Sequence, residues 1–283
     1  FQHPSLQKDL IALNTLKKVE KGGDVLRIEL QLPFAWNTGV EQVKQQLSDA
    51  LLKATDSKEI KWIVNYQIAT LKRANNQPAV KGVKNIIAVT SGKGGVGKSS
   101  VSVNLALALQ AQGARVGILD ADIYGPSVPH MLGAPHQRPT SPDNQHITPI
   151  KAHGLSANSI GFLMDEDNAT IWRGPMASSA LSQLLNETLW DSLDYLVIDM
   201  PPGTGDIQLT LSQQIPVTGA VVVTTPQDIA LLDAVKGVSM FERVSVPVLG
   251  IVENMSMHIC SNCGHHEAIF GTVGAEKMAQ KYN

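Results

Sequence analysis

The feature that most constrains this chain is a glycine-rich loop directly after a short apolar run. Residues 85–91 read NIIAVTS and residues 92–99 read GKGGVGKS, which matches the pattern G-x-x-x-x-G-K-[ST]. Between a strand and a helix, such a loop surrounds nucleotide phosphates with backbone N–H groups at the helix N-terminus. We predict that Lys98 reaches the β- and γ-phosphates and that Ser99 offers its hydroxyl to Mg²⁺. A glycine turn that only caps a helix explains the two lysines poorly.

Lys93, the second residue of the loop, has no role in an ordinary phosphate-binding loop. It is a surplus cation beside Lys98. We therefore treat it as the residue that distinguishes this loop from the general pattern.

Net charge and apolar runs exclude several classes of partner. The formal net charge is -2, which gives no general attraction to nucleic acid or to an anionic membrane. No apolar run approaches the roughly 18 residues of a membrane span, and the first residues lack the features of a signal peptide. The two cysteines are too few for a disulfide framework and suit a reducing compartment. We expect a cytoplasmic protein with no nucleic-acid and no membrane partner.

The N-terminal part predicts a small α+β domain over residues 1–74, followed by a linker over residues 75–82. A helix-like start precedes a strand pair around Gly22 and Gly23. Residues 38–54 predict an amphipathic helix, with Thr38 as N-cap and Glu41 completing a capping box. Residues 60–68 predict another strand.

Residues 83–283 predict a doubly wound α/β domain with a mainly parallel sheet. Short, nearly continuous apolar strands alternate with helices, as in a parallel sheet covered on both faces. The expected strands are residues 86–89, 116–119, 195–198, 220–223 and 248–252. We assign the Met residues, Trp172 and the apolar helix positions between Ala177 and Leu193 to the core, and Arg173 remains without an assigned role. Ligands of such sheets bind at the carboxyl ends of the strands, where the polar motifs lie.

Three aspartates follow apolar strands at this edge. Asp199 stands where a phosphate-loop enzyme places a carboxylate that binds Mg²⁺ directly or through water. Asp120 and Asp122 follow another strand, and one could orient metal-bound waters while the other positions an attacking water. Two turn carboxylates without catalytic function are an equal alternative for that pair.

Cys260 and Cys263 form the second chemical motif, in a polar loop with nearby histidines. A metal or cluster site, a redox dithiol and two buried thiols are the possible readings. Common iron-sulfur clusters need four thiolates, and the chain has two. A symmetric dimer would supply the others. Zinc bound with histidines is the rival, although Cys263 and His265 are closer in sequence than usual ligand pairs.

Together, these motifs resemble the bacterial Mrp/ApbC proteins, iron-sulfur cluster carrier ATPases with a deviant phosphate loop. The resemblance spans essentially the whole chain, and the small N-terminal domain looks like the iron-sulfur assembly domain of that family. The matching motifs are GKGGVGKS at 92–99, LDADIYGPS at 119–127, DMPPGTGD at 199–206, NMS at 254–256 and CSNC at 260–263.

The resemblance implies a role for each matching residue. Lys93 would reach a phosphate across a dimer interface, Lys98 would bind phosphate within its own chain, and Asp122 would position the hydrolytic water. Ser99, Asp120 and Asp199 would surround Mg²⁺, and Cys260 with Cys263 would hold a 4Fe-4S cluster bridging two subunits. The implied nucleotide contacts are Gly92, Lys93, Gly94, Gly95, Val96, Gly97, Lys98, Ser99, Ser100 and Asn254, the last of these with adenine.

Family members continue beyond the position of Asn283. The chain lacks an initiator Met and stops within a helical pattern at residues 275–282, so we expect it to be incomplete.

The expected function is therefore that of a homodimeric, Mg²⁺-dependent ATPase that carries 4Fe-4S clusters to apo-proteins and interacts with cluster scaffold proteins. The alternatives are a positioning or partition ATPase, an electron-transfer ATPase and a zinc-binding ATPase of the same fold.

Overall fold

The computed structural model describes residues 1–163, 174–272 and 274–282. Trp172 and Arg173, which the sequence analysis considered, lie outside these ranges. The chain forms two compact units, one of residues 1–70 with 108–114, the other of residues 71–107 with 115–283. Residues 75–82, expected as a linker, belong to the larger unit. There, Asn75 donates a hydrogen bond to the Ile215 carbonyl at 2.9 Å and Val80 is buried.

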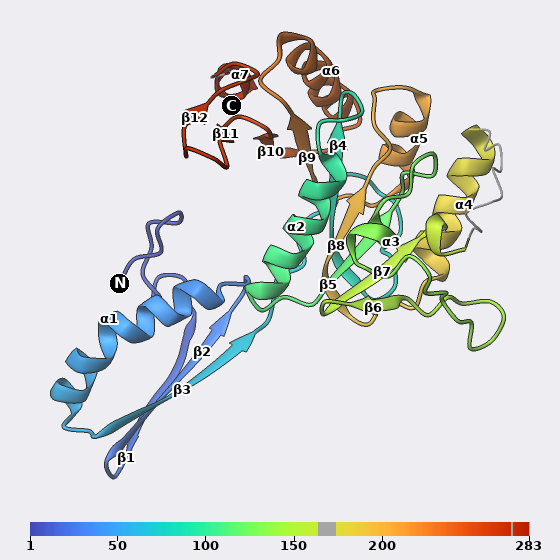
Figure 1. Ribbon diagram of the computed structural model, residues 1–283. Helices are drawn as coiled ribbons and strands as arrows, with labels where there is room; N and C mark the ends of the chain where they lie inside the picture. Colours follow the sequence, from blue (N-terminus) through green and yellow to red (C-terminus); the bar gives the residue numbers. More distant parts are fainter. Residues whose placement is uncertain (164–173, 273, 283) are drawn as a thin grey trace. The chain divides into compact units, whose positions relative to one another are not determined.

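The smaller unit is a three-stranded sheet packed against one helix (Figure 1). Strand β1 (Leu16–Gly22) pairs antiparallel with β2 (Val25–Leu32), and β2 pairs parallel with β3 (Glu59–Tyr66). Alternate residues of β2 are buried and pack with residues of β3 and helix α1 (Asn37–Thr55). The strand pair predicted around Gly22 and Gly23 is therefore confirmed.

Two predictions for this unit are wrong. Residues 4–6 and 10–14 form turns, so the chain does not start with a helix. The N-cap of α1 is Trp36 without a side-chain cap, and Thr38 lies within the first turn. The Thr38 hydroxyl instead donates to the Gln112 side chain at 2.9 Å, which also accepts from the Thr38 backbone at 3.1 Å. An acceptor far along the chain thus replaces the local capping box.

The larger unit contains a seven-stranded sheet of order β10-β9-β4-β8-β5-β7-β6 (Figure 1). Every neighbouring pair is parallel except β6 with β7. Its strands are β4 (Val83–Ser91), β5 (Val116–Asp120), β6 (Ile150–Ala152), β7 (Leu155–Ser159), β8 (Leu193–Asp199), β9 (Gly219–Thr224) and β10 (Val248–Glu253). The predicted doubly wound α/β fold and its five strands are confirmed. Strands β6 and β7 were not among the expected strands.

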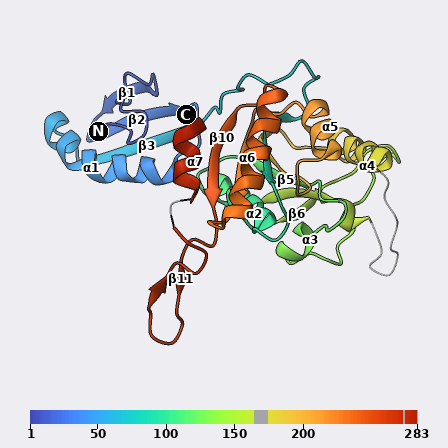
Figure 2. The same cartoon turned by 90° about the horizontal axis from the view of Figure 1, so that it is seen from above.

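Helices lie on both faces of this sheet (Figure 2). One face packs against α4 (Gly174–Glu187), α5 (Asp206–Gln214) and α6 (Asp228–Arg243), which contribute to a shared apolar core. On the other side lie α2 (Lys98–Ala111) and the short α3 (Val128–Met131). A 3-10 turn, η1 (Ile160–Phe162), follows β7, and α7 (Gly274–Tyr282) packs against β10. No helix among the described residues is long and apolar enough to cross a membrane.

The assignment of methionines to the core holds only in part. Met200, Met240 and Met278 are buried. Four others are 43% to 54% exposed: Met131, Met176, Met255 and Met257. The last two lie beside the cysteine motif, in a segment whose described residues are mostly exposed.

Candidate functional site

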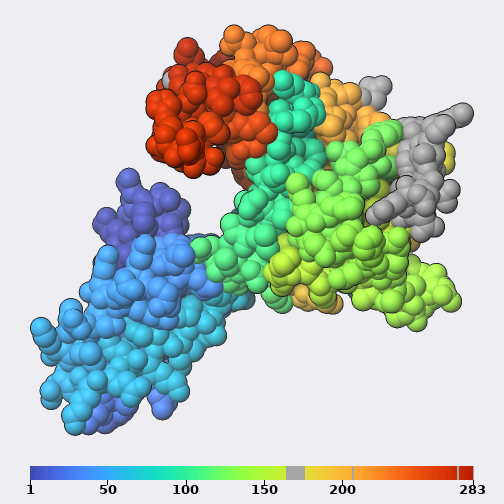
Figure 3. Space-filling model, in the orientation of Figure 1, coloured from blue at the N-terminus to red at the C-terminus, as the bar shows by residue number. Residues whose placement is uncertain are grey.

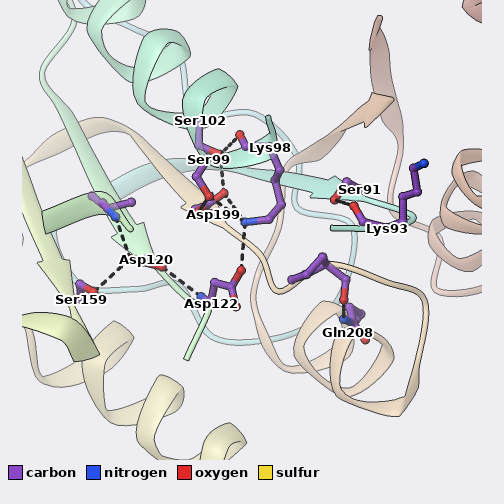
Figure 4. Close-up of polar contacts among 12 residues, drawn as sticks. Ser91, Lys93, Lys98, Ser99, Ser102, Asp120, Asp122, Ser159, Asp199 and Gln208 are labelled. Carbon is purple, nitrogen blue, oxygen red and sulfur yellow. Dashed lines mark hydrogen bonds and ion pairs between the residues drawn. The ribbon is translucent and has the colours of Figure 1, made fainter. Parts of the chain in front are cut away.

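The polar motifs meet at the carboxyl edge of the parallel sheet (Figure 4). The glycine-rich loop links β4 to α2, Asp120 ends β5, and Asp199 ends β8. Because β4, β8 and β5 are consecutive neighbours in the sheet, their ends lie together. The fold therefore brings together three segments that are far apart in the sequence.

Close packing explains part of the glycine content of the loop. A Cβ atom on Gly92 would lie 2.3 Å from the Asp233 carbonyl in α6, and one on Gly97 would lie 2.2 Å from the Asn254 side-chain amide. Gly95 and Gly97 have φ angles of +82° and +85°, which side chains disfavour. A Cβ on Gly94 or Gly95 would meet no atom within 4 Å. Backbone at these two residues is thus open to a ligand on one side.

Lys98 is the buried cation at the centre of the site. Its side chain is 6% exposed, and Nζ lies 2.7 Å from Asp199 Oδ1 and 3.5 Å from Asp122 Oδ2. The Ser99 hydroxyl donates to Asp199 Oδ2 at 2.6 Å. A buried ammonium group loses its hydration, and the two carboxylates compensate this cost through their ion pairs with it.

Ser99 and Asp199 provide the donor set that fits Mg²⁺. The ion prefers hard oxygen ligands, and a hydroxyl and a carboxylate oxygen here are in direct contact. Lys98 also donates to the Ser99 hydroxyl at 3.2 Å. The pair would hold the ion next to the phosphate-binding backbone.

Asp122 is mostly buried beside Lys98. Burial raises the pKa of Asp122, and the Lys98 charge opposes this shift while Asp199 adds to it. A carboxyl group with a raised pKa beside a lysine suits a group that orients a water molecule or accepts a proton from it.

Asp120 is completely buried, and its oxygens serve the adjoining backbone. Oδ1 accepts from the Asp122 N–H at 3.1 Å, and Oδ2 accepts from the Val128 N–H and the Ser159 hydroxyl, each at 3.1 Å. Burial, with the negative charge of Asp199, raises the pKa of Asp120 to about 7. These bonds fix the Asp122 loop and the start of α3.

The side chain of Lys93 lies in a different environment from that of Lys98. Its carbonyl accepts from the Ser91 hydroxyl at 2.8 Å, while its partly buried side chain points away from the carboxylates (Figure 4). Among the residues that the structure describes, no carboxylate forms an ion pair with its ammonium group. Lys93 thus takes no part in the network of carboxylates around Lys98, in agreement with its lack of a role in an ordinary phosphate-binding loop.

The remaining predicted contacts occupy different positions around the loop. Ser100 is exposed in the first turn of α2, and its carbonyl accepts from Asn104. The Asn254 amide donates to the Val96 carbonyl at 2.9 Å, so Asn254 directly contacts the loop.

Sequence reasoning missed three polar residues of the site. The buried Ser102 hydroxyl donates to Asp199 Oδ1 at 2.7 Å, Ser159 binds Asp120, and the Gln208 amide donates to the Pro202 carbonyl. Ser102 follows Lys98 by one helical turn, and this i, i+4 spacing could have placed it on the same face of α2. No local pattern identifies Ser159 or Gln208.

The cysteines lie on an exposed hairpin beyond β10 (Figure 2). Strands β11 (His258–Ile259) and β12 (His266–Glu267) flank a turn in which Cys260 is partly exposed and Cys263 exposed. The interpretation as two buried thiols is therefore wrong. Backbone N–H groups of Cys263 and Asn262, with the Cys263 side chain, lower the pKa of the Cys260 thiol, which favours the thiolate that binds metal.

A zinc site within one chain does not form in the described part of the structure. No group of three or more His, Cys, Asp or Glu residues there could hold a metal ion. Among the described residues, the nearby histidines therefore do not lie with the cysteine pair as a group of three ligands.

Comparisons with known proteins agree with this geometry. A ParA family model, described as NUBPL iron-transfer P-loop NTPase, matches residues 82–283. The iron-sulfur cluster carrier protein of Haemophilus influenzae is 92% identical over 283 residues, covering 100% of this chain and 76% of that protein. The protein of the same name from Escherichia coli K12 is 68% identical, covering 100% and 77%.

A solved structure also matches. The nucleotide-binding protein of Archaeoglobus fulgidus, in complex with ADP, has 40% sequence identity and a TM-score of 0.63, covering 71% of this chain and 79% of that chain. The matched family model spans most of the chain, and both curated relatives cover all of it. The chain therefore belongs to the iron-transfer P-loop NTPases, the family of the iron-sulfur cluster carrier ATPases.

Proposed function

We propose that this chain binds and hydrolyses ATP with Mg²⁺ and, as a homodimer, carries a 4Fe-4S cluster for delivery to apo-proteins. The observation that carries the proposal is a pair of incomplete sites. The Lys93 side chain points away from the aspartates of the site (Figure 4), and the hairpin offers two thiols where a cluster needs four. A two-fold axis would complete both sites with the same residues of a second copy.

The polar groups of the site have distinct roles in ATP hydrolysis under this proposal. Open backbone at Gly94 and Gly95 would bind the phosphates, and Lys98 would compensate their charge. Ser99 and Asp199 would hold Mg²⁺, which neutralises charge that develops on the phosphate oxygens. Asp122 would orient the attacking water, held in place by the hydrogen bond between its N–H and Asp120. Lys93 would approach the phosphates of the partner subunit.

Anaerobic reconstitution with iron and sulfide tests cluster carriage. We expect visible cluster absorbance and about two iron atoms per chain, as for one 4Fe-4S cluster shared by two chains. Cys260→Ala should lose both signals, whereas Ser261→Ala, in the same turn, should retain them. A protein that binds only zinc, without cluster absorbance in the wild type, contradicts the proposal.

Lys93→Ala tests the shared nucleotide site. Phosphate release should fall by at least about 100-fold, the loss seen when one charge-stabilising group is removed from a preorganised site. Nucleotide binding by the monomer should persist, because Lys98 and the loop backbone are unchanged. Lys81→Ala, outside the loop, is the matched control. Unchanged turnover in Lys93→Ala contradicts a composite site.

A further inference from the structure

The cysteine hairpin has little packing of its own to hold it in place. Nearly every residue from 257 to 272 is exposed (Figure 3, orange-red). β11 and β12 pair through only two residues each. The orientation of the hairpin must therefore be set where the segment leaves β10 and where it enters α7.

Glu253 contacts both of these ends. Its Oε1 accepts from the Ser256 hydroxyl at 2.9 Å, at the departing end. Its Oε2 accepts from the Ala275 N–H at 2.7 Å, in the first turn of α7. One carboxylate thus joins the two ends of the segment that carries the cysteines, and charge on the acceptor makes such bonds stronger than neutral ones.

The next residue, Asn254, contacts the phosphate-binding loop. Besides the bond from its side chain to the Val96 carbonyl, its backbone N–H donates to the Thr224 carbonyl at 2.8 Å. A Cβ on Gly97 would lie 2.2 Å from the Asn254 amide and 3.8 Å from the Met255 methyl group. Backbone movement at Val96 or Gly97 therefore cannot leave Asn254 undisturbed.

Met255 lies between this anchor and the hairpin in a conformation that costs energy. Its φ angle is +59°, which is uncommon for a residue other than glycine. Its side chain is 43% exposed, so burial does not offset the cost. The surrounding hydrogen bonds of Glu253 and Asn254 hold this turn, and a change in them would release it.

We propose that Glu253 and Asn254 act as positioning residues that link the orientation of the cysteine hairpin to the state of the phosphate-binding loop. Nucleotide phosphates that bind the loop N–H groups would fix the Val96–Gly97 backbone and, through Asn254, the turn at Met255. Exposure of the Cys260 and Cys263 thiols then depends on nucleotide. This inference rests on the proposed function, since it names how nucleotide regulates the cluster site.

The test uses the cluster-free protein, so it does not depend on cluster binding. We would measure the alkylation rate of the thiols with iodoacetamide, with and without saturating Mg-ADP. We expect nucleotide to change the wild-type rate by about fivefold or more, the lower end of typical coupling between sites. Glu253→Gln should bring the ratio of the two rates close to one, while retaining nucleotide binding measured by calorimetry.

Two further variants make the result specific. Ser256→Ala removes only one of the bonds to Glu253 and should give an intermediate ratio, even if Glu253→Gln folds poorly. Glu267→Gln lies on the hairpin itself and should keep the wild-type ratio. A wild-type ratio of one, an unchanged ratio in both Glu253→Gln and Ser256→Ala, or an equal loss in Glu267→Gln overturns the inference. Failure of cluster reconstitution alone would instead count against the proposed function.

Discussion

The two ends of strand β8 carry aspartates in opposite electrostatic situations. At the amino end, Asp194 accepts from Lys84 at 2.8 Å and from the Arg115 guanidinium at 3.1 Å and 3.2 Å. Although burial raises the pKa of Asp194, its hydrogen bonds with Arg115 and Lys84 outweigh this and lower it. At the carboxyl end, Lys98 is the cation beside Asp199 and Asp122, with Asp120 close by, and the pKa values of Asp120 and Asp122 are raised.

This difference separates a structural group from a functional one. Two cations around one carboxylate stabilise the fold without a ligand. Several buried carboxylates around one cation carry an electrostatic cost, which a divalent cation would reduce. Perturbed carboxylates of this kind cluster at functional sites. The charge balance at each end of one strand therefore indicates which end binds ligand.

Removal of Lys98 is expected to have the largest effect. Lys98→Ala should lower the rate of ATP hydrolysis by at least about 100-fold, because it removes the phosphate-binding charge. It should also destabilise the protein by about 3 kcal/mol, because buried carboxylates lose their counter-charge. Phosphate release and urea unfolding measure the two effects.

Lys84→Ala is the matched control at the other end of the strand. Arg115 still pairs with Asp194 there, so turnover should stay within about twofold of the wild type, as expected for a change outside the site. Similar losses of turnover in the two variants would remove the functional distinction between the two ends.

Neutralising Asp194 should affect stability and not turnover. Asp194→Asn should lower the free energy of unfolding at pH 7 by about 2 kcal/mol, the scale of hydrogen bonds to a charged group. Because the folded pKa is lowered, this stabilisation is present above the unfolded value and is lost as the pH falls below about 4. Urea unfolding should show a smaller difference in the free energy of unfolding between variant and wild type at pH 3.5 than at pH 7. An equal difference at both pH values would mean that the charge of Asp194 is not its source.

The sequence predicted what depends on local pattern. Apolar runs identified five strands of the sheet, and the glycine-rich motif located Lys98 and Ser99, since period and spacing encode both. The capping box at Thr38 failed because Gln112, more than 70 residues away, supplies the acceptor. Likewise, nothing near Asp120 in the sequence reveals that Ser159 from β7 donates to it. Strand order brings the polar motifs to one edge of the sheet, but no sequence pattern indicates which individual side chains of distant segments pair.

Neutralising Asp120 should give a pH dependence of stability opposite in sign to that of Asp194→Asn. Its pKa of about 7 exceeds the value in the unfolded chain, which is about 4. Between these two pH values the folded state therefore keeps a proton that the unfolded chain has already released. Stability from this group therefore falls as the pH rises through that window. In Asp120→Asn, the free energy of unfolding should no longer fall with pH through the titration of this group. The variant also replaces one acceptor oxygen by an amide, which weakens the hydrogen bond from the Asp122 or the Val128 N–H. Urea unfolding without nucleotide and with EDTA, at pH 5 and pH 8, measures the change. A decline as steep as that of the wild type would show that Asp120 is ionised throughout, and that the two ends of β8 differ less than their surroundings indicate.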